Sequence, residues 1–76
     1  MLIKILGSGC SKCVALGENV KLALAKTGKQ AEIVKVTDFA AMAAYGVMST
    51  PALVIDEKVV SYGRVLKPDD IVPLLP

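Results

Sequence analysis

Two cysteines separated by two residues, Cys10 and Cys13, are the side chains of this sequence most able to do chemistry. A thiolate is both a nucleophile and a metal ligand, so the pair indicates either thiol–disulfide exchange or metal binding. The chain has no histidine, so a closed four-ligand zinc site would need two chains to pool their sulfurs. Two core cysteines placed by chance are a further alternative.

The position of the pair favours redox chemistry. Residues 2–6 are typical of a buried central strand, and a helical stripe of apolar residues begins at Cys13. The helix start should stabilise a thiolate at Cys10, and Lys12 adds a positive charge nearby. We therefore predict that Cys10 attacks a substrate disulfide and that Cys13, one turn further along, resolves the mixed disulfide.

Hydrophobic periodicity and turn residues predict the remaining elements, with a single domain over residues 1–76. The predicted order is β-α-β-α-β-β-α: strand 2–6, a helix from the cysteine pair to Thr27, strand 31–36, helix 39–45, strand 52–55, strand 59–62, and a last helix from Pro68 to about Leu75. One helix between the first two strands fits a parallel βαβ unit. Asp56-Glu57-Lys58 is predicted to be the tight turn of a hairpin.

Composition narrows the class of protein. The net charge of +2 and the aromatic content of 4% argue against a nucleic-acid partner. No stretch has the length of a membrane span, and the N-terminus lacks the features of a signal peptide. We therefore expect a cytoplasmic protein, and in that compartment a Cys-x-x-Cys pair is more often catalytic or metal-binding than a structural disulfide.

A second motif, Thr50-Pro51, precedes the third predicted strand. Together with Cys-x-x-Cys after the first strand, it resembles the thioredoxin/glutaredoxin superfamily. The resemblance implies a minimal thioredoxin-like α/β fold, a four-stranded mixed sheet flanked by helices. It also implies that Pro51 is a cis proline beside the two cysteines, and that the backbone of Thr50 binds an extended substrate segment. Ser11 and Lys12, between the cysteines, are placed in the same substrate-binding surface.

Three segments carry a closer resemblance that covers essentially the whole chain. They are similar to the short prokaryotic thioredoxin-like proteins called redox-active disulfide protein 2, and they are residues 7–13, 49–56 and 63–65. That family implies reduction of protein disulfides, with electrons from a thioredoxin-reductase-like donor. We separately expect a monomer with no cofactor besides the Cys10–Cys13 disulfide. Glutathione is not expected, because Gly63 is followed by Arg64 instead of the Gly-Gly-Asp turn of glutaredoxins.

Some features depart from the family pattern or leave alternatives open. Thioredoxins keep a buried acid in the first strand of this minimal fold, where the only charge here is Lys4. Met42 and Met48 could supply thioether ligands, although core packing is the commoner role of methionine. Tyr45 could cover the site or only pack, and Arg64 could lie near a substrate groove or on solvated surface. The competing functions are a copper-chaperone-like metal module and a redox-sensing subunit with little turnover.

Overall fold

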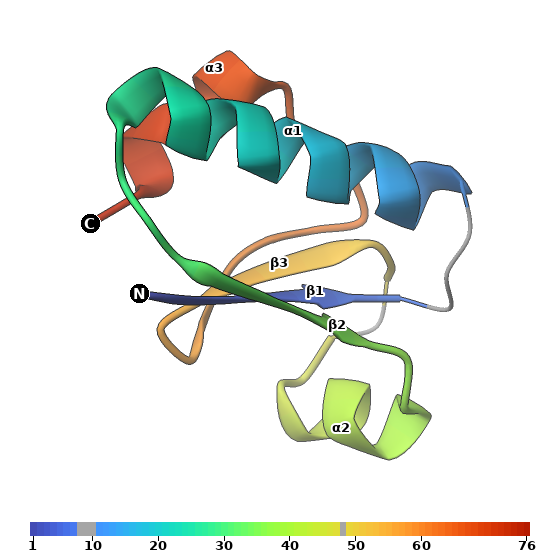
Figure 1. The fold of residues 1–76 in the computed structure, drawn as a ribbon. Coiled ribbons are helices and arrows are strands. Elements are labelled where there is room, and N and C mark those ends of the chain that lie inside the picture. Colours follow the sequence, from blue (N-terminus) through green and yellow to red (C-terminus); the bar gives the residue numbers. More distant parts are fainter. Residues whose placement is uncertain (8–10, 48) are drawn as a thin grey trace.

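The structure is a computed structural model that describes residues 1–7, 11–47 and 49–76. The order is the one predicted, β-α-β-α-β-β-α, with a final 3-10 turn η1 (Figure 1). The elements are β1 (Leu2–Leu6), α1 (Ser11–Thr27), β2 (Glu32–Val36), α2 (Phe39–Ala44), β3 (Ala52–Ile55), β4 (Lys58–Tyr62), α3 (Pro68–Ile71) and η1 (Val72–Leu74). In the described part of the chain, no helix is both long and apolar enough to cross a membrane.

The four strands form one mixed sheet in the order β2-β1-β3-β4. β1 is parallel to β2 and antiparallel to β3, and β3 is antiparallel to β4. The register places Leu6 opposite both Val36 and Ala52, and Ala52 opposite Tyr62. The last residues of β1, β2 and β4 and the first residue of β3 therefore meet at one end of the sheet. This confirms the predicted mixed sheet with β1 as a central strand.

Helices cover both faces of the sheet (Figure 1). α1 and α3 pack on one face, over a core that includes Ile3, Leu16, Val20, Leu53 and Ile71. α2 lies on the opposite face, where Met42 packs with buried residues of β1 and β3, namely Leu6, Ala52 and Val54. Because α2 is short, it covers only the part of the sheet nearest the end where these strands meet.

Local sequence signals explain where α1 ends and where α2 begins. The predicted stripe of α1 is its buried face, which consists of Cys13, Leu16, Gly17, Val20, Ala23 and Leu24. The helix ends at Thr27, and Gly28 follows with a φ of +69°, a left-handed conformation that glycine adopts at little cost. Asp38 caps α2, because its carboxylate accepts a hydrogen bond of 3.1 Å from the Ala40 N–H.

The C-terminal helix differs from the prediction. It was expected to continue to about Leu75, but the α-helical part ends at Ile71 and a 3-10 turn covers Val72–Leu74. Pro73 explains the change, because proline has no N–H with which to continue the α-helical ladder. The N–H of Leu75 instead donates to the Val72 carbonyl at 3.2 Å, which closes the 3-10 turn.

The hairpin between β3 and β4 is tighter than predicted. Its turn consists of Asp56 and Glu57 alone, whose φ angles are +49° and +69°, so β4 begins one residue early, at Lys58. Two consecutive positive φ angles are the requirement of the type I′ turn, whose twist matches that of the flanking strands. Further along, Val54 pairs with Val59 and Leu53 with Ser61, which leaves Val60 as the extra residue of a β-bulge.

Candidate functional site

The segments that carry the described site residues, Ser11, Lys12, Cys13, Thr50 and Pro51, lie at the end of the sheet where the four strands meet. Gly7 follows β1, Pro51 precedes β3 and Gly63 follows β4. α1 begins at the same end, above the last residues of β1 (Figure 1). The fold therefore brings together a segment from the start of the chain and a segment from its middle that the sequence analysis assigned to one site.

Gly7 and Cys13 make the closest approach in this region. Cys13 is only 6% exposed, and its Sγ lies 2.2 Å from the point that a Cβ on Gly7 would occupy. Real Cβ atoms do not come so close to another heavy atom, so only glycine fits beside this thiol. The Gly7 N–H donates to the Val36 carbonyl at 2.9 Å, which fixes the end of β1 against β2. The position of Cys13 thus depends on the absence of a side chain at residue 7.

Thr50 and Pro51 are far from Gly7 in the sequence but lie close to it in the fold. The Thr50–Pro51 peptide bond is cis, as the superfamily resemblance implied, and Pro51 is fully buried. The Thr50 Cβ lies 3.8 Å from the same hypothetical Cβ of Gly7. Thr50 and the Cys13 thiol are therefore both within 4 Å of one point in space.

Gly63 contacts the segment of Ser49, Thr50 and Pro51, which is called the cis-proline segment below. The Gly63 N–H donates to the Pro51 carbonyl at 2.9 Å. Gly63 has a φ of +73°, and a Cβ there would lie 3.1 Å from the Cβ of Ser49. Glycine is thus required both by its backbone conformation and by the close passage of the cis-proline segment.

The thiol of Cys13 borders a small hollow that the sequence analysis did not foresee. The hollow has a volume of about 30 Å³, and its lining residues are Ile5, Gly7, Cys13, Val14, Lys35 and Thr37. Lys35 lies directly opposite Ile5 in the parallel pairing of β1 with β2. The Lys35 side chain is exposed. Pairing the carboxyl ends of the two parallel strands is the signal that could have placed Lys35 near Cys13.

The other predicted residues of the cysteine motif are placed only in part. Ser11 and Lys12 form the first turn of α1, and both are exposed. The predicted nucleophile Cys10 lies outside the described residues, as does Met48, the candidate thioether ligand. Among residues 1–7, 11–47 and 49–76, no cluster of three His, Cys, Asp or Glu side chains could hold a metal ion. Met42 is 4% exposed and packs in the core on the α2 side of the sheet.

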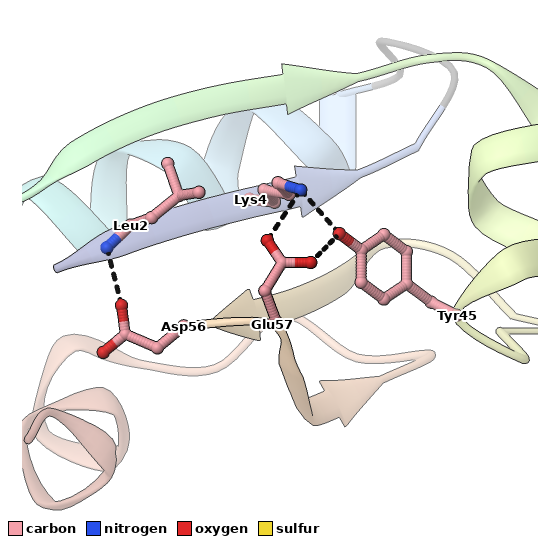
Figure 2. Close-up of polar contacts among 5 residues, drawn as sticks. All are labelled: Leu2, Lys4, Tyr45, Asp56 and Glu57. Carbon is pink, nitrogen blue, oxygen red and sulfur yellow. Dashed lines mark hydrogen bonds and ion pairs between the residues drawn. The ribbon is translucent and has the colours of Figure 1, made fainter.

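Lys4 is the centre of a polar cluster on the α2 side of the sheet (Figure 2). Its Nζ donates a hydrogen bond of 2.6 Å to the Tyr45 hydroxyl and forms a 2.9 Å ion pair with Glu57. The Tyr45 hydroxyl donates in turn to Glu57 at 2.8 Å. Hydrogen bonding to Glu57 and then to Tyr45 raises the pKa of Lys4, and the same contacts with Lys4 and Tyr45 lower the pKa of Glu57. Tyr45 therefore packs against the core and also bonds through its hydroxyl.

A larger hollow lies away from the cysteine motif. It has a volume of about 640 Å³ and lies along β4 and α3, with Tyr62, Arg64, Asp70 and Leu74 among its lining residues. Arg64 is exposed at the edge of this hollow, and no hydrogen bond or ion pair joins it to the cysteine motif or to Pro51 among the described residues. Neither Cys13 nor Pro51 lines this hollow, so the hollow is separate from the candidate site.

The sheet order, the helices on both faces and the cis proline before β3 define an α/β protein of the thioredoxin-like class. A family model described as the thioredoxin domain matches residues 1–76, and the chain belongs to this family. It is 41% identical over 71 residues to a thioredoxin of Methanocaldococcus jannaschii, an alignment that covers 93% of this chain and 81% of that protein. It is 31% identical over 75 residues to a thioredoxin of Methanothermobacter thermautotrophicus, with 99% and 97% covered.

The fold also decides against the copper-chaperone architecture. That architecture needs a second strand–helix–strand unit in the latter half of the chain. Here β3 and β4 instead form a hairpin directly after a cis proline, and a helix follows. The narrower resemblance, to redox-active disulfide protein 2, stays a prediction.

Proposed function

We propose that the protein is a thiol–disulfide oxidoreductase that reduces protein disulfides with Cys10 and Cys13. The observation that carries this proposal is the buried Cys13 thiol, packed on Gly7 with the Thr50–Pro51 segment beside it. A thiol at this depth is out of reach of a folded protein substrate. It is well placed, however, to attack a disulfide already formed by the cysteine three residues before it. Cys13 is accordingly the resolving thiol.

The attacking role falls to Cys10. In the sequence it directly precedes Ser11, the first residue of the 17-residue helix α1. The first N–H groups of a helix have no intrahelical partners and stabilise negative charge, so a thiolate at this position is favoured. The ammonium group of Lys12, exposed in the first helical turn, adds to this effect.

The reaction proceeds by two displacements in which two electrons pass to the substrate. The Cys10 thiolate attacks one sulfur of the substrate disulfide, the substrate S–S bond breaks, and the other sulfur leaves as a thiolate that takes a proton from solvent. The Cys13 thiol then loses its proton to solvent, and the resulting thiolate attacks the sulfur of Cys10. This releases the second substrate thiol and leaves a Cys10–Cys13 disulfide. A dithiol donor, in the cell a thioredoxin-reductase-like protein, reduces that disulfide again.

Substrate binding is assigned to the exposed surface around the cysteine motif. We place an extended segment of the substrate against the backbone of Thr50, in the manner of an added strand, with Pro51 below it. Ser11 and Lys12 border this surface from the start of α1. We expect the protein to work as a monomer in the cytoplasm, with protein partners and without glutathione.

The test is reduction of insulin disulfides with dithiothreitol as the electron donor. We expect the wild-type protein to accelerate the reaction, Cys10→Ser to abolish the acceleration, and Cys13→Ser to accumulate a mixed disulfide with the substrate. The mixed disulfide is visible by mass spectrometry and disappears on addition of excess dithiothreitol. Equal activity of the wild type and of Cys10→Ser would rule out the proposed mechanism.

A further inference from the structure

The Lys4–Tyr45–Glu57 cluster joins three elements that are far apart in the sequence. Lys4 belongs to β1, Tyr45 is the C-cap of α2, and Glu57 lies in the turn between β3 and β4. The three contacts of 2.6, 2.8 and 2.9 Å close a triangle (Figure 2), and Lys4 Nζ also lies 5.2 Å from the centre of the Tyr45 ring. The C-terminal end of α2 is thereby attached to both the central strand and the hairpin.

Glu57 occupies a backbone position that does not favour glutamate. Its φ is +69°, and glycine is the residue commonly found at the second position of a type I′ turn. A glutamate there is more strained than a glycine. What glutamate provides instead is a carboxylate that contacts Lys4 and Tyr45 at the same time. The residue thus fits the cluster better than it fits the turn.

α2 has little apolar contact with which to hold its position. The helix has six residues, and Met42 is the buried one. Its capping residue Tyr45 therefore supplies a second, polar attachment to the sheet. Thr50 follows Tyr45 by five residues in the sequence. On the other side of Thr50, the Pro51 carbonyl is bonded to the Gly63 N–H. The cis-proline segment is thus bonded downstream to β4, and it follows the end of α2 after a short connection in the sequence.

We propose that the Lys4–Tyr45–Glu57 cluster positions the Thr50–Pro51 segment for binding an extended protein substrate. The proposal rests on the proposed function and refines it, because it concerns the class of substrate. A protein segment must pair with the backbone of Thr50, so its binding depends on where that backbone lies. A small disulfide needs only the thiolate. The cluster therefore acts as a positioning device that selects for protein disulfides.

The test compares a protein disulfide, insulin, with a small aromatic disulfide, 5,5′-dithiobis(2-nitrobenzoate). Tyr45→Phe keeps the ring and removes the hydroxyl. The variant loses both hydrogen bonds of the hydroxyl, so we expect it to raise the KM for insulin at least about threefold and to leave the rate with the small disulfide within about twofold. Glu57→Gly should act in the same direction although it suits the turn better, which separates the cluster from the stability of the hairpin.

Asp69→Asn is the matched control. It removes the exposed Lys26–Asp69 ion pair of 2.5 Å, which joins α1 to α3 and has no connection to the cis-proline segment. We expect it to leave both substrates unaffected. A Tyr45→Phe protein that loses activity equally on both disulfides, or on neither, would overturn the positioning role.

A second readout separates this inference from the proposed function. If the wild-type protein reduced neither disulfide, the proposed function would fail. The cluster would then be judged by amide hydrogen exchange at the segment. We expect Tyr45→Phe and Glu57→Gly to accelerate exchange of the Gly63 N–H, which donates to the Pro51 carbonyl of the segment, at least about threefold, and Asp69→Asn to leave it unchanged. Unchanged exchange in all three variants would contradict the positioning role on its own.

Discussion

The Sγ atom of Cys13 occupies space that any side chain on Gly7 would need, with only 2.2 Å to the nearest Cβ position. Gly7 also ends a buried central strand and is bonded to Val36, so its backbone has little room to move. We therefore predict that Gly7→Ala displaces the thiol and destabilises the protein by about 1–3 kcal/mol, the cost of overpacking a core. Denaturant unfolding of the reduced protein measures the loss.

Gly17→Ala provides the matched control for this substitution. Gly17 is also buried, but it lies within α1, and its added Cβ would meet only the Ile5 Cδ1 atom at 3.4 Å. Replacing a helical glycine by alanine raises helix stability by about 1 kcal/mol. We expect the two glycine variants to change stability in opposite directions. A Gly7→Ala protein as stable as the wild type would show that the Cys13 thiol is not held where the structure has it.

The Lys4–Glu57 pair predicts how stability depends on pH. Hydrogen bonds from Lys4 and then from Tyr45 hold the pKa of Glu57 below its ordinary value of 4.5. A carboxyl group with a lowered pKa in the folded state stabilises the fold above its unfolded pKa, and this stabilisation is lost as the pH falls. The free energy of unfolding should therefore decrease from pH 4.5 downward, through the lowered pKa of Glu57.

Two variants test this decrease in stability at acid pH. Glu57→Gln should make the decrease below pH 4.5 shallower, because the neutral amide no longer titrates. Asp69→Asn should remove a separate part, since Lys26 lowers the pKa of Asp69 from 3.8. At the alkaline end, Lys4 has a raised pKa, so its contribution is complete below 10.5 and is lost as the pH rises through the raised value. If the free energies of unfolding of Glu57→Gln and of the wild type decreased identically below pH 4.5, Glu57 would not be the group that causes the decrease.

The sequence predicted those parts of the fold that depend on local patterns. The apolar stripe of α1 follows from a 3.6-residue period, and the β3–β4 hairpin follows from turn residues between two apolar runs. The resemblance supplied the cis bond before Pro51, which no local pattern indicates. The structure confirms these features. They could be predicted because each is encoded within a few neighbouring residues or within one recognisable motif.

Long-range pairs were beyond the reach of the sequence. Lys4 and Glu57 meet only because β1 lies beside the hairpin, and nothing near either residue indicates the other. In the sequence Lys4 is the only charge of its strand, and the structure pairs it with a carboxylate from the turn, on the side of the sheet away from Cys13. Lys35 is exposed, and its place beside the hollow at Cys13 becomes visible only when its strand is paired with β1. Charges that act across the sheet are therefore the features that need a structure.

Lys35 leads to a prediction about the ionisation of Cys13. Both residues line the same hollow of about 30 Å³, and no carboxylate is among the described residues that line it. Lys35 is exposed, and a lysine beside a thiol favours the thiolate over the thiol. In a Cys10→Ser background, Lys35→Met should shift thiolate formation at Cys13 to higher pH, as followed by ultraviolet absorbance or by the alkylation rate.

Two further lysine variants test whether that shift is local. Lys35→Arg keeps the charge and should leave the curve near that of the parent protein. Lys29→Met removes a lysine that bonds to the carbonyl of Pro76, far from the cysteine motif, and should have no effect. If Lys35→Met and Lys29→Met gave the same titration curve, Lys35 would have no part in ionising the resolving thiol.

Substitution of Gly63 tests whether its contacts position the cis-proline segment. An alanine there would have to adopt a φ of +73° and would place its Cβ 3.1 Å from the Ser49 Cβ. Gly28→Ala is the matched control, because Gly28 has a φ of +69° but open space around it. Both variants should lose about 1 kcal/mol of stability through the left-handed backbone. Only Gly63→Ala should also raise the KM for insulin, since it displaces Ser49 next to Thr50. An equal KM in the two variants would mean that the segment tolerates displacement at its β4 side.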